Sequence, residues 1–222
     1  MILYIIRHGE TDWNVQHKNQ GVTDIPLNEN GRRLAKITGD ALKSVRFDLI
    51  ISSPLSRAVE TARIITKGTN IPLYEDDRIM EIDWGKWEGL NSRDQSIEAM
   101  QYQLRLYFEK PWEFSGAPDG ENMYQVYQRV SQFCSELSRD KKMKDKTVLL
   151  STHGTIVRHI MNYYLKDEDK VDFWRGAFPR NCSVSILKVL NQETELLMKD
   201  AFYYEDSMSP DYYCMDDFID EA

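Results

Sequence analysis

The chain has 222 residues, of which 41% are hydrophobic, and this fits one domain with a sizeable core. No apolar run approaches the roughly 20 residues that cross a membrane. The apolar start from Met1 to Ile6 is too short for the core of a signal peptide. The cysteines, Cys134, Cys182 and Cys214, are far apart and odd in number, which favours neither a disulfide framework nor a cysteine metal site. We therefore expect a cytoplasmic protein without a membrane partner.

The net charge of −8 is concentrated at the C-terminal end of the chain. Residues 205–222 hold seven acidic residues and no Lys or Arg, and the remainder has 29 acidic and 28 basic residues. This nearly neutral remainder lacks the clustered excess of Lys and Arg that nucleic-acid binding needs. Because like charges disfavour compact packing, we expect a domain over residues 1–204 and a mobile acidic tail over 205–222 that the chemistry does not need.

Short apolar runs predict buried strands, and helical periodicity between them predicts helices. In chain order, the strands are expected at Leu3–Ile6, Asp48–Ser52, Val148–Thr152 and Val184–Val189. The helices are expected at Gly31–Val45, Leu55–Thr66 and Met123–Leu137. Strands that alternate with helices predict an α/β fold with a mostly parallel sheet covered on both faces.

Residues 91–122 fit this alternation poorly. The segment is polar and aromatic, with Tyr102, Tyr107, Phe108, Trp112 and Phe114, and it ends in Gly116, Pro118 and Gly120. We interpret it as a small insertion that caps a site. Ordinary core packing of the aromatic side chains is the alternative.

Polar residues follow three of the predicted strands, at the edge where open α/β sheets bind ligands. The segments are Arg7-His8-Gly9-Glu10-Thr11, Ser53-Pro54-Leu55-Ser56-Arg57 and His153-Gly154-Thr155. Three strands thus deliver His8, Arg57 and His153 to one edge of the sheet. The planar fork of arginine matches phosphate oxygens, and helix N-termini add backbone donors. Arg7 and Arg57 therefore predict an anion pocket.

Two kinds of side chain in these segments suit the cleavage of a phosphate ester. An imidazole such as His8 attacks phosphorus when one ring nitrogen is free and the other is held. The leaving oxygen needs a proton, which a carboxyl group with a raised pKa supplies. Glu81 lies among bulky apolar neighbours that raise its pKa by desolvation, although Asp83 and Glu88 compete nearby. His17 and His159 follow no predicted strand and are expected to be non-catalytic.

The motifs together resemble the signature of the histidine phosphatase superfamily, also called the phosphoglycerate mutase-like family. The similar segments are Arg7–Thr11 with Asn14, Asp24–Gly31, Ser53–Ala58 with Thr61 and Ala62, Glu81 with Trp84–Gly89, Gly120–Asn122, Ser151–Gly154 and Asn181–Ser185. Asn122 stands where Ser is commoner in the family. Each motif is weak alone, whereas the joint order and spacing are specific. The resemblance implies a three-layer α/β/α sandwich.

The resemblance also implies a phosphatase that needs neither a metal ion nor a cofactor. His8 would become phosphorylated, and Glu81 would be the general acid and then the base that activates water. The phosphoryl oxygens would be bound by Arg7, Asn14, Gln20, Arg57, His153 and the Gly154 backbone N–H. The implied partners are a small-molecule phosphomonoester and phosphate, and the sequence does not indicate an oligomeric state.

Two alternatives come from other classes of protein. His8-Gly9-Glu10 with His153 also matches an iron site of two histidines and one carboxylate. Arg7 and Arg57 argue against it, because they would repel the cation. A non-catalytic phosphate-binding module would need the arginines but not Glu81.

A third alternative is a mutase of the same family. Such mutases are expected to carry an adjacent Arg pair in the insertion, where this chain has only the separated Arg93, Arg105 and Lys110. Asn usually follows the second His-Gly in mutases, and this chain has Thr155 there. The aromatic, acid-rich insertion suits an ester with an apolar or neutral alcohol part. We therefore expect a phosphatase.

Overall fold

The computed structural model describes residues 1–166, 172–190 and 193–210. Its strands are β1 (Ile2–Arg7), β2 (Leu49–Ser52), β3 (Leu73–Glu75), β4 (Thr147–Thr152), β5 (Val184–Leu190) and β6 (Glu193–Ala201). Its α-helices are α1 (Asp12–Val15), α2 (Glu29–Ala41), α3 (Ser56–Ile65), α4 (Glu98–Glu109), α5 (Met123–Arg139) and α6 (Gly154–Leu165). Single-turn 3₁₀ helices lie at Asp77–Ile79, Gly85–Trp87, Pro111–Glu113, Lys141–Met143 and Asp206–Met208.

The strands form one sheet in the order β3-β2-β4-β1-β5-β6. Neighbouring strands from β3 to β1 are parallel, and β5 and β6 extend the sheet in antiparallel pairs. The predicted mostly parallel sheet is thus confirmed. The sequence prediction missed the edge strands β3 and β6, because most of their side chains are exposed or half-buried and form no apolar run.

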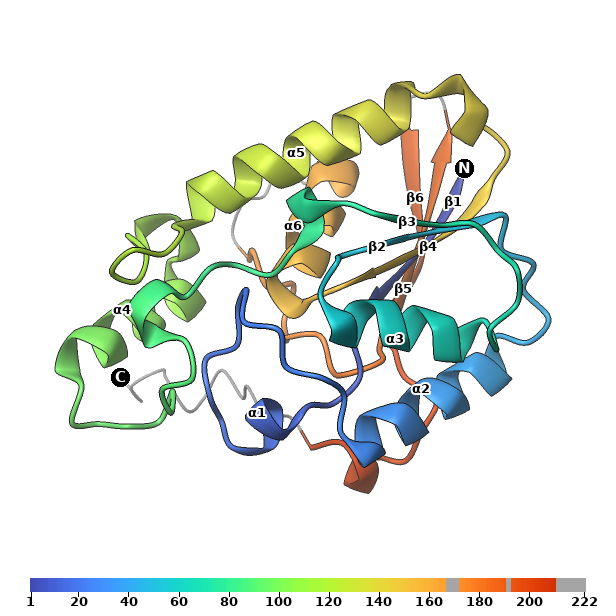
Figure 1. The fold of residues 1–222 in the computed structure, drawn as a ribbon. Helices are drawn as coiled ribbons and strands as arrows, with labels where there is room; N and C mark the ends of the chain where they lie inside the picture. Colours follow the sequence, from blue (N-terminus) through green and yellow to red (C-terminus); the bar gives the residue numbers. More distant parts are fainter. Residues whose placement is uncertain (167–171, 191–192, 211–222) are drawn as a thin grey trace.

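Helices cover both faces of the sheet (Figure 1). Alternate side chains of β1 point to opposite faces, as the pleat of a strand requires. Leu3 and Ile5 pack in one core with residues of α5 and α6, such as Val130 and Ile156. Ile6 packs in a second core with residues of α2 and α3, such as Leu34. The three-layer α/β/α sandwich is therefore confirmed.

The predicted insertion over 91–122 contains α4 and lies beyond the main sheet (Figure 1). Tyr107, Phe108 and Phe114 are buried in the same core as α5 and α6, whereas Tyr102 and Trp112 are exposed. The two interpretations of its aromatic residues do not exclude each other. Part of the insertion is core, and part of that core also faces the pocket described below.

The described start of the acidic tail packs against the domain. The Asn30 side chain donates to the Met208 carbonyl at 2.8 Å, Arg180 pairs with Asp206, and Ser209 is fully buried. The expectation of a mobile tail therefore fails for residues 205–210. Residues 211–222 lie outside the described residues.

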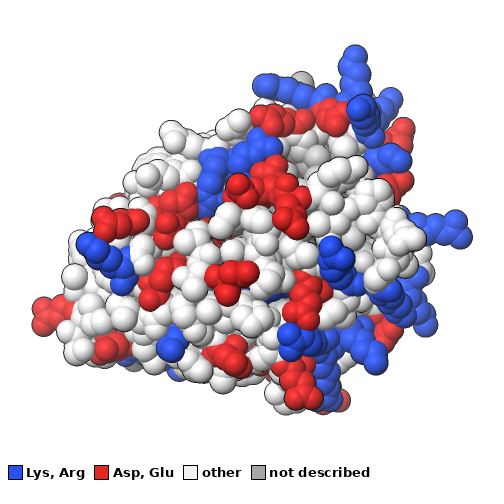
Figure 2. All heavy atoms as spheres, viewed as in Figure 1, with Lys and Arg blue, Asp and Glu red and all other residues white. Residues whose placement is uncertain are grey.

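On the face shown in Figure 2, Lys and Arg side chains gather toward the right with some acidic side chains among them, and most acidic side chains lie toward the left and centre. Among the residues that the structure describes, no helix is both long and apolar enough to cross a membrane.

Two truncations test which part of the tail is docked. A chain that ends at Pro210 keeps the contacts of Asp206 and Met208 and is the reference for the comparison. A chain that ends at Tyr204 loses them and should unfold more easily by about 1–2 kcal/mol. Calorimetry measures both. Turnover should persist in each, because the predicted site residues all precede residue 205, and equal melting of the two truncated chains would contradict the docking.

Candidate active site

The pairing of β1 with β4 brings His8 and His153 together. Arg7 lies opposite Thr152 in this parallel pair, so the two histidines follow directly at the same edge. The His8 N–H donates to the Thr152 carbonyl at 2.8 Å, and the two imidazole centroids lie 5.1 Å apart. Three strand ends deliver His8, His153 and Arg57 to this edge, as expected from the sequence.

The hydrogen bonds of His8 fix its tautomer. Its Nδ1 lies 2.7 Å from the Gly9 carbonyl, which can only accept, so Nδ1 carries the proton and Nε2 keeps its lone pair. Burial, followed by the positive charges of Arg57 and Arg7, holds the pKa of His8 well below its ordinary value. The ring is therefore neutral near pH 7, which is the form that a nucleophile requires.

The guanidinium groups of Arg7 and Arg57 are held by backbone carbonyls. Arg7 donates through Nη1 to the Pro179 carbonyl, and its guanidinium lies 5.0 Å from the centre of the Phe178 ring. The fully buried Arg57 donates to the carbonyls of Gly21 and Thr23 at 2.6 and 2.9 Å. These carbonyl acceptors orient the two guanidinium groups.

The loop that receives Arg57 is itself shaped by Glu88. The Glu88 carboxylate accepts from the backbone N–H groups of Val22, Thr23 and Trp84 at 2.9 to 3.2 Å. Asp83 likewise accepts from the Gly85 N–H at 2.7 Å. The two acids that competed with Glu81 in the sequence are therefore engaged by backbone groups.

His153 and Gly154 begin helix α6 beside His8. His153 Nε2 lies 2.8 Å from the Ser53 hydroxyl, and burial, with the charge of Arg57, lowers its pKa well below the ordinary value. A Cβ atom on Gly154 would lie 2.2 Å from the Phe178 ring, so no larger residue fits without moving the ring that covers Arg7. Arg57, His153 and Gly154 do not line the open pocket but lie around His8.

Glu81 is buried at the pocket with both carboxylate oxygens in use. One oxygen accepts from the Ile82 N–H at 3.0 Å and the other from the Thr155 N–H at 3.3 Å. Desolvation raises the pKa of Glu81 above its ordinary value, and these hydrogen bonds offset only part of the rise. Glu81 is therefore the carboxyl group of the pocket lining whose pKa is shifted in the direction that favours holding a proton.

The backbone around Glu81 is fixed by Arg129 of helix α5. Arg129 donates to the carbonyl oxygens of Arg78, Met80 and Glu81 at 2.7 to 3.0 Å, and it pairs with Glu121 at 2.8 Å. The 78–81 segment follows β3 and has only one 3₁₀ turn of its own. Arg129, from a helix that is distant in the sequence, therefore fixes the backbone from which the Glu81 side chain projects.

Asn14 and Gln20 reach the pocket from the loop after β1. Asn14 forms a capping box with Thr11 at the start of α1, and its Oδ1 accepts from the Asn181 side chain at 3.3 Å. Asn181 also donates to the His8 carbonyl at 3.0 Å. Gln20 Oε1 accepts from the Thr11 hydroxyl at 2.6 Å, and its Nε2 has no hydrogen-bond partner among the described residues. That buried donor is open to a ligand.

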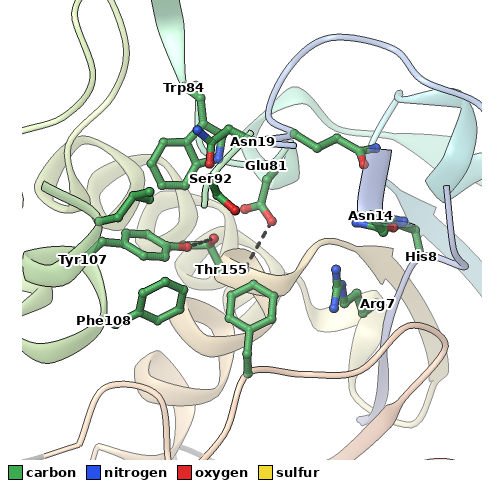
Figure 3. A pocket seen from close by; sticks show the side chains of 13 residues that line it. Arg7, His8, Asn14, Asn19, Glu81, Trp84, Ser92, Tyr107, Phe108 and Thr155 are labelled. Atoms are coloured by element: carbon green, nitrogen blue, oxygen red, sulfur yellow. Dashed lines mark hydrogen bonds between the residues drawn. The ribbon is translucent and has the colours of Figure 1, made fainter. Parts of the chain in front are cut away.

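The pocket lies between the strand ends and the insertion (Figure 3). Its lining is Arg7, His8, Asn14, Asn19, Gln20, Glu81, Trp84, Ser92, Leu104, Tyr107, Phe108, Thr155 and Phe178. The side chains of Arg7 and His8, at the end of β1, and of Glu81, in the segment after β3, lie around one space. One side of the pocket is thus polar and basic, and the other is largely aromatic.

The sequence reasoning gave no role to several residues that hold this site: Ser53, Thr61, Tyr107, Arg129, Thr155 and Asn181. Thr61 accepts from the Gly9 N–H at 2.9 Å and donates to the Arg57 carbonyl at 2.6 Å. Ser53, Thr61, Thr155 and Asn181 lie in or beside the matched motifs, which is a signal of their importance. Tyr107 and Arg129 carry no such local signal.

The residues proposed for an iron site do not converge. The Glu10 carboxylate accepts from the side chains of Asn28 and Asn30 at 2.8 and 3.0 Å, which turns it toward α2. Within the described ranges, no group of three or more His, Cys, Asp or Glu side chains is placed so that it could hold a metal ion. The arrangement of donors therefore does not support the two-histidine, one-carboxylate alternative.

The fold and site define a class of α/β protein in which a strand-end histidine faces a basic pocket. The chain belongs to the histidine phosphatase superfamily (branch 1), whose sequence model matches residues 3–200. The chain is 32% identical to phosphoserine phosphatase 1 of Hydrogenobacter thermophilus, over 88% of this chain and 90% of that protein. It is 31% identical to a 2,3-bisphosphoglycerate-dependent phosphoglycerate mutase of Cytophaga hutchinsonii, over 79% and 84%.

A solved structure, YhfR of Bacillus stearothermophilus, has the same fold. It superposes with a TM-score of 0.78 at 33% identity, over 90% of this chain and 96% of that chain. The family resemblance seen in the sequence is therefore confirmed. The members named above include a phosphatase and a mutase, so family membership alone does not choose between the two reactions.

His159 lies outside the pocket, in an aromatic cluster with Trp112, Tyr127 and Phe173. Burial, with the charge of Arg129, lowers its pKa to about 3. The unfolded chain binds a proton at His159 below about pH 6.5, and the folded chain does not. The free energy of unfolding therefore falls as the pH drops below that value, by about 1.4 kcal/mol per pH unit for this group.

We predict that His159→Phe makes the loss of stability between pH 6.5 and 4 shallower by about that slope. Urea unfolding across this pH range measures it. Turnover at pH 7 should be retained, because His159 contacts no pocket residue named above. An unchanged slope would show that His159 is protonated in the folded state.

Proposed function

We propose that the protein hydrolyses small phosphomonoesters through a phosphohistidine on His8, without a metal ion. One observation carries the proposal: His8 is a neutral imidazole whose Nδ1 is held by Gly9, beside two arginines and across the pocket from a buried acid. The names of phosphatase relatives support it. A non-catalytic phosphate-binding module would have no use for the desolvated Glu81.

In the first step, His8 Nε2 attacks phosphorus, and the bond from phosphorus to the alcohol oxygen breaks. Glu81 gives its proton to that oxygen, which leaves as the alcohol. Arg7, Arg57 and His153 bind the phosphoryl oxygens, with Asn14, Gln20 and the Gly154 N–H as further donors. The unsatisfied Nε2 of Gln20 is one donor that a phosphoryl oxygen would complete.

In the second step, the Glu81 carboxylate takes a proton from water, and the water oxygen attacks phosphorus. The bond from phosphorus to His8 Nε2 breaks, so phosphate is released and Glu81 is protonated again. The arginines supply the positive charge that the transferring group needs, in place of a cation. Turnover should therefore persist after exhaustive chelation.

The outer part of the pocket suits an alcohol without charge. Trp84, Leu104, Tyr107, Phe108 and Phe178 form most of this wall, with the neutral Asn19 and Ser92. Arg7 is the sole Lys or Arg in the lining found for the described residues, and it serves the phosphoryl group. We infer that the substrate is an ester of an aromatic or apolar alcohol.

The mutase alternative requires a cationic group for the phosphoglycerate carboxylate. Of the basic residues in the insertion, Arg93 contacts His17 at 3.1 Å and Lys110 faces Glu113 at 3.8 Å, and none of them lines the pocket. This arrangement favours hydrolysis over phosphoryl transfer between the positions of a phosphoglycerate.

A covalent intermediate on His8 is the first prediction of this mechanism. Rapid quenching after mixing with ³²P-labelled substrate should trap label that is stable in base and lost in acid. His8→Ala should abolish both the label and turnover, and wild-type turnover should survive EDTA treatment. His17→Ala is the matched control and should leave both intact. Label that persists in His8→Ala, or turnover that depends on added metal, would overturn the mechanism.

The substrate class gives a second prediction. Phenyl phosphate should be hydrolysed with a higher kcat/KM than phosphoserine or 3-phosphoglycerate, because the described lining has no Lys or Arg for their carboxylates besides Arg7, which serves the phosphoryl group. Phe108→Leu should lower kcat/KM for phenyl phosphate roughly tenfold through lost ring contact, whereas the exposed Tyr102→Leu on the same helix should not. Rapid interconversion of 2- and 3-phosphoglycerate with negligible release of phosphate would assign the mutase reaction instead.

A further inference from the structure

A hydroxyl pair connects the insertion to Glu81. The Tyr107 hydroxyl of α4 lies 2.6 Å from Thr155 Oγ1 in the first turn of α6. Thr155 in turn donates to Glu81 through its backbone N–H at 3.3 Å, and its side chain lowers the pKa of that carboxyl. Figure 3 shows Tyr107, Thr155 and Glu81 in sequence along one side of the pocket.

The direction of these hydrogen bonds follows from the chemistry of the groups. Once Glu81 has given up its proton, its carboxylate can only accept, so a Thr155 hydroxyl turned toward it donates its single proton. Thr155 Oγ1 is then the acceptor toward Tyr107, and the Tyr107 hydroxyl is the donor. A proton on Tyr107 therefore determines where the proton of Thr155 points.

Tyr107 is fixed in a manner that suits an orienting role. It is 2% exposed, and its ring packs against Trp84, Phe114 and Trp174 with centroids 4.8 to 5.4 Å apart. The Trp174 Nε1–H donates to the Tyr107 carbonyl at 3.1 Å. Neither its ring nor its backbone can move without repacking the core around it.

We propose that Tyr107 is a positioning residue that directs the Thr155 hydroxyl onto Glu81 and so couples the insertion to proton transfer. The inference rests on the proposed role of Glu81 as acid and base. When Glu81 gives its proton to the leaving alcohol, the carboxylate that forms receives an oriented donor at once. Esters with a poor leaving group depend on this proton, whereas nitrophenyl esters largely do not.

Other groups around Glu81 stay constant in the test. Arg7 on β1 faces the carboxylate, Arg129 on α5 binds its backbone carbonyl, and the Ile82 N–H binds its second oxygen. His8 shares the pocket. A change seen in Tyr107→Phe is therefore a change in the hydroxyl pair.

The experiment compares an alkyl phosphate with 4-nitrophenyl phosphate in Tyr107→Phe. We expect kcat/KM for the alkyl ester to fall roughly three- to tenfold, as for the loss of one hydrogen bond, and that for the nitrophenyl ester to change less than about twofold. The alkaline limb of the alkyl-ester profile should move to higher pH, because a carboxylate that loses a donor holds its proton more tightly.

Matched variants separate orientation from packing. Tyr102→Phe makes the same change at an exposed position of α4 and should alter nothing. Thr155→Ser keeps the hydroxyl and should retain the wild-type pH profile, whereas Thr155→Val should shift the profile at least as far as Tyr107→Phe. An equal loss for both esters in Tyr107→Phe with an unmoved alkaline limb would show that Tyr107 acts through packing alone, and would overturn the proposal.

A measurement without turnover distinguishes this inference from the proposed function. The ¹³C signal of the Glu81 carboxyl, assigned with Glu81→Gln, should titrate at higher pH in Tyr107→Phe than in the wild-type protein. That shift supports the hydroxyl pair even if the protein hydrolyses none of the esters, in which case the proposed function alone fails. Superimposable titration curves would overturn the inference while leaving the His8 mechanism in place.

Discussion

The parallel register of β1 on β4 is the constraint on which the site depends. Arg7 lies opposite Thr152, and the ladder continues one residue further through the His8 N–H. A slip of one residue would move His8 about 3.3 Å along the strand and turn the side chains of β1 to the wrong faces. β2 is keyed to the same edge, with Ser52 opposite Ser151, which places the start of α3 and Arg57 beside both histidines.

The sequence predicted the helices and strands that bury at least one whole face, because these show a hydrophobic pattern. It missed the edge strands, which do not. The central strands β1, β2 and β4 carry mostly apolar residues because helices cover both faces of the sheet, and α5 repeats an apolar residue at each turn. The edge strand β6 has mostly exposed or half-buried residues, so its pairing with β5 left no pattern in the sequence. The packing of residues 205–210 against the domain was also missed. The prediction rested on the acidic composition of the segment, whereas individual contacts of Asp206 and Met208 hold it in place.

The site residues that could be predicted are those that the strand order alone brings together, at the ends of parallel strands. The site could not be predicted where a side chain binds a backbone carbonyl, because every residue carries that acceptor. Arg129 donates to carbonyl oxygens about 50 residues earlier in the chain, and Arg57 to carbonyl oxygens of a loop before it. These contacts have an electrostatic consequence. They hold cationic groups near the two neutral histidines, where the positive charge favours an incoming dianion.

Tyr107 and Phe108 belong both to the hydrophobic core and to the pocket wall. The insertion therefore cannot change substrate specificity at these positions without also changing the packing of the core. Most substitutions at packed positions cost about 1 kcal/mol or more, against a total stability of roughly 5–15 kcal/mol. A lineage that reshapes this wall for a new alcohol therefore draws on the same margin that keeps the chain folded. Stabilising substitutions elsewhere in the chain must therefore come first. In the evolution of such a protein, each change of substrate specificity should follow an increase in folding stability.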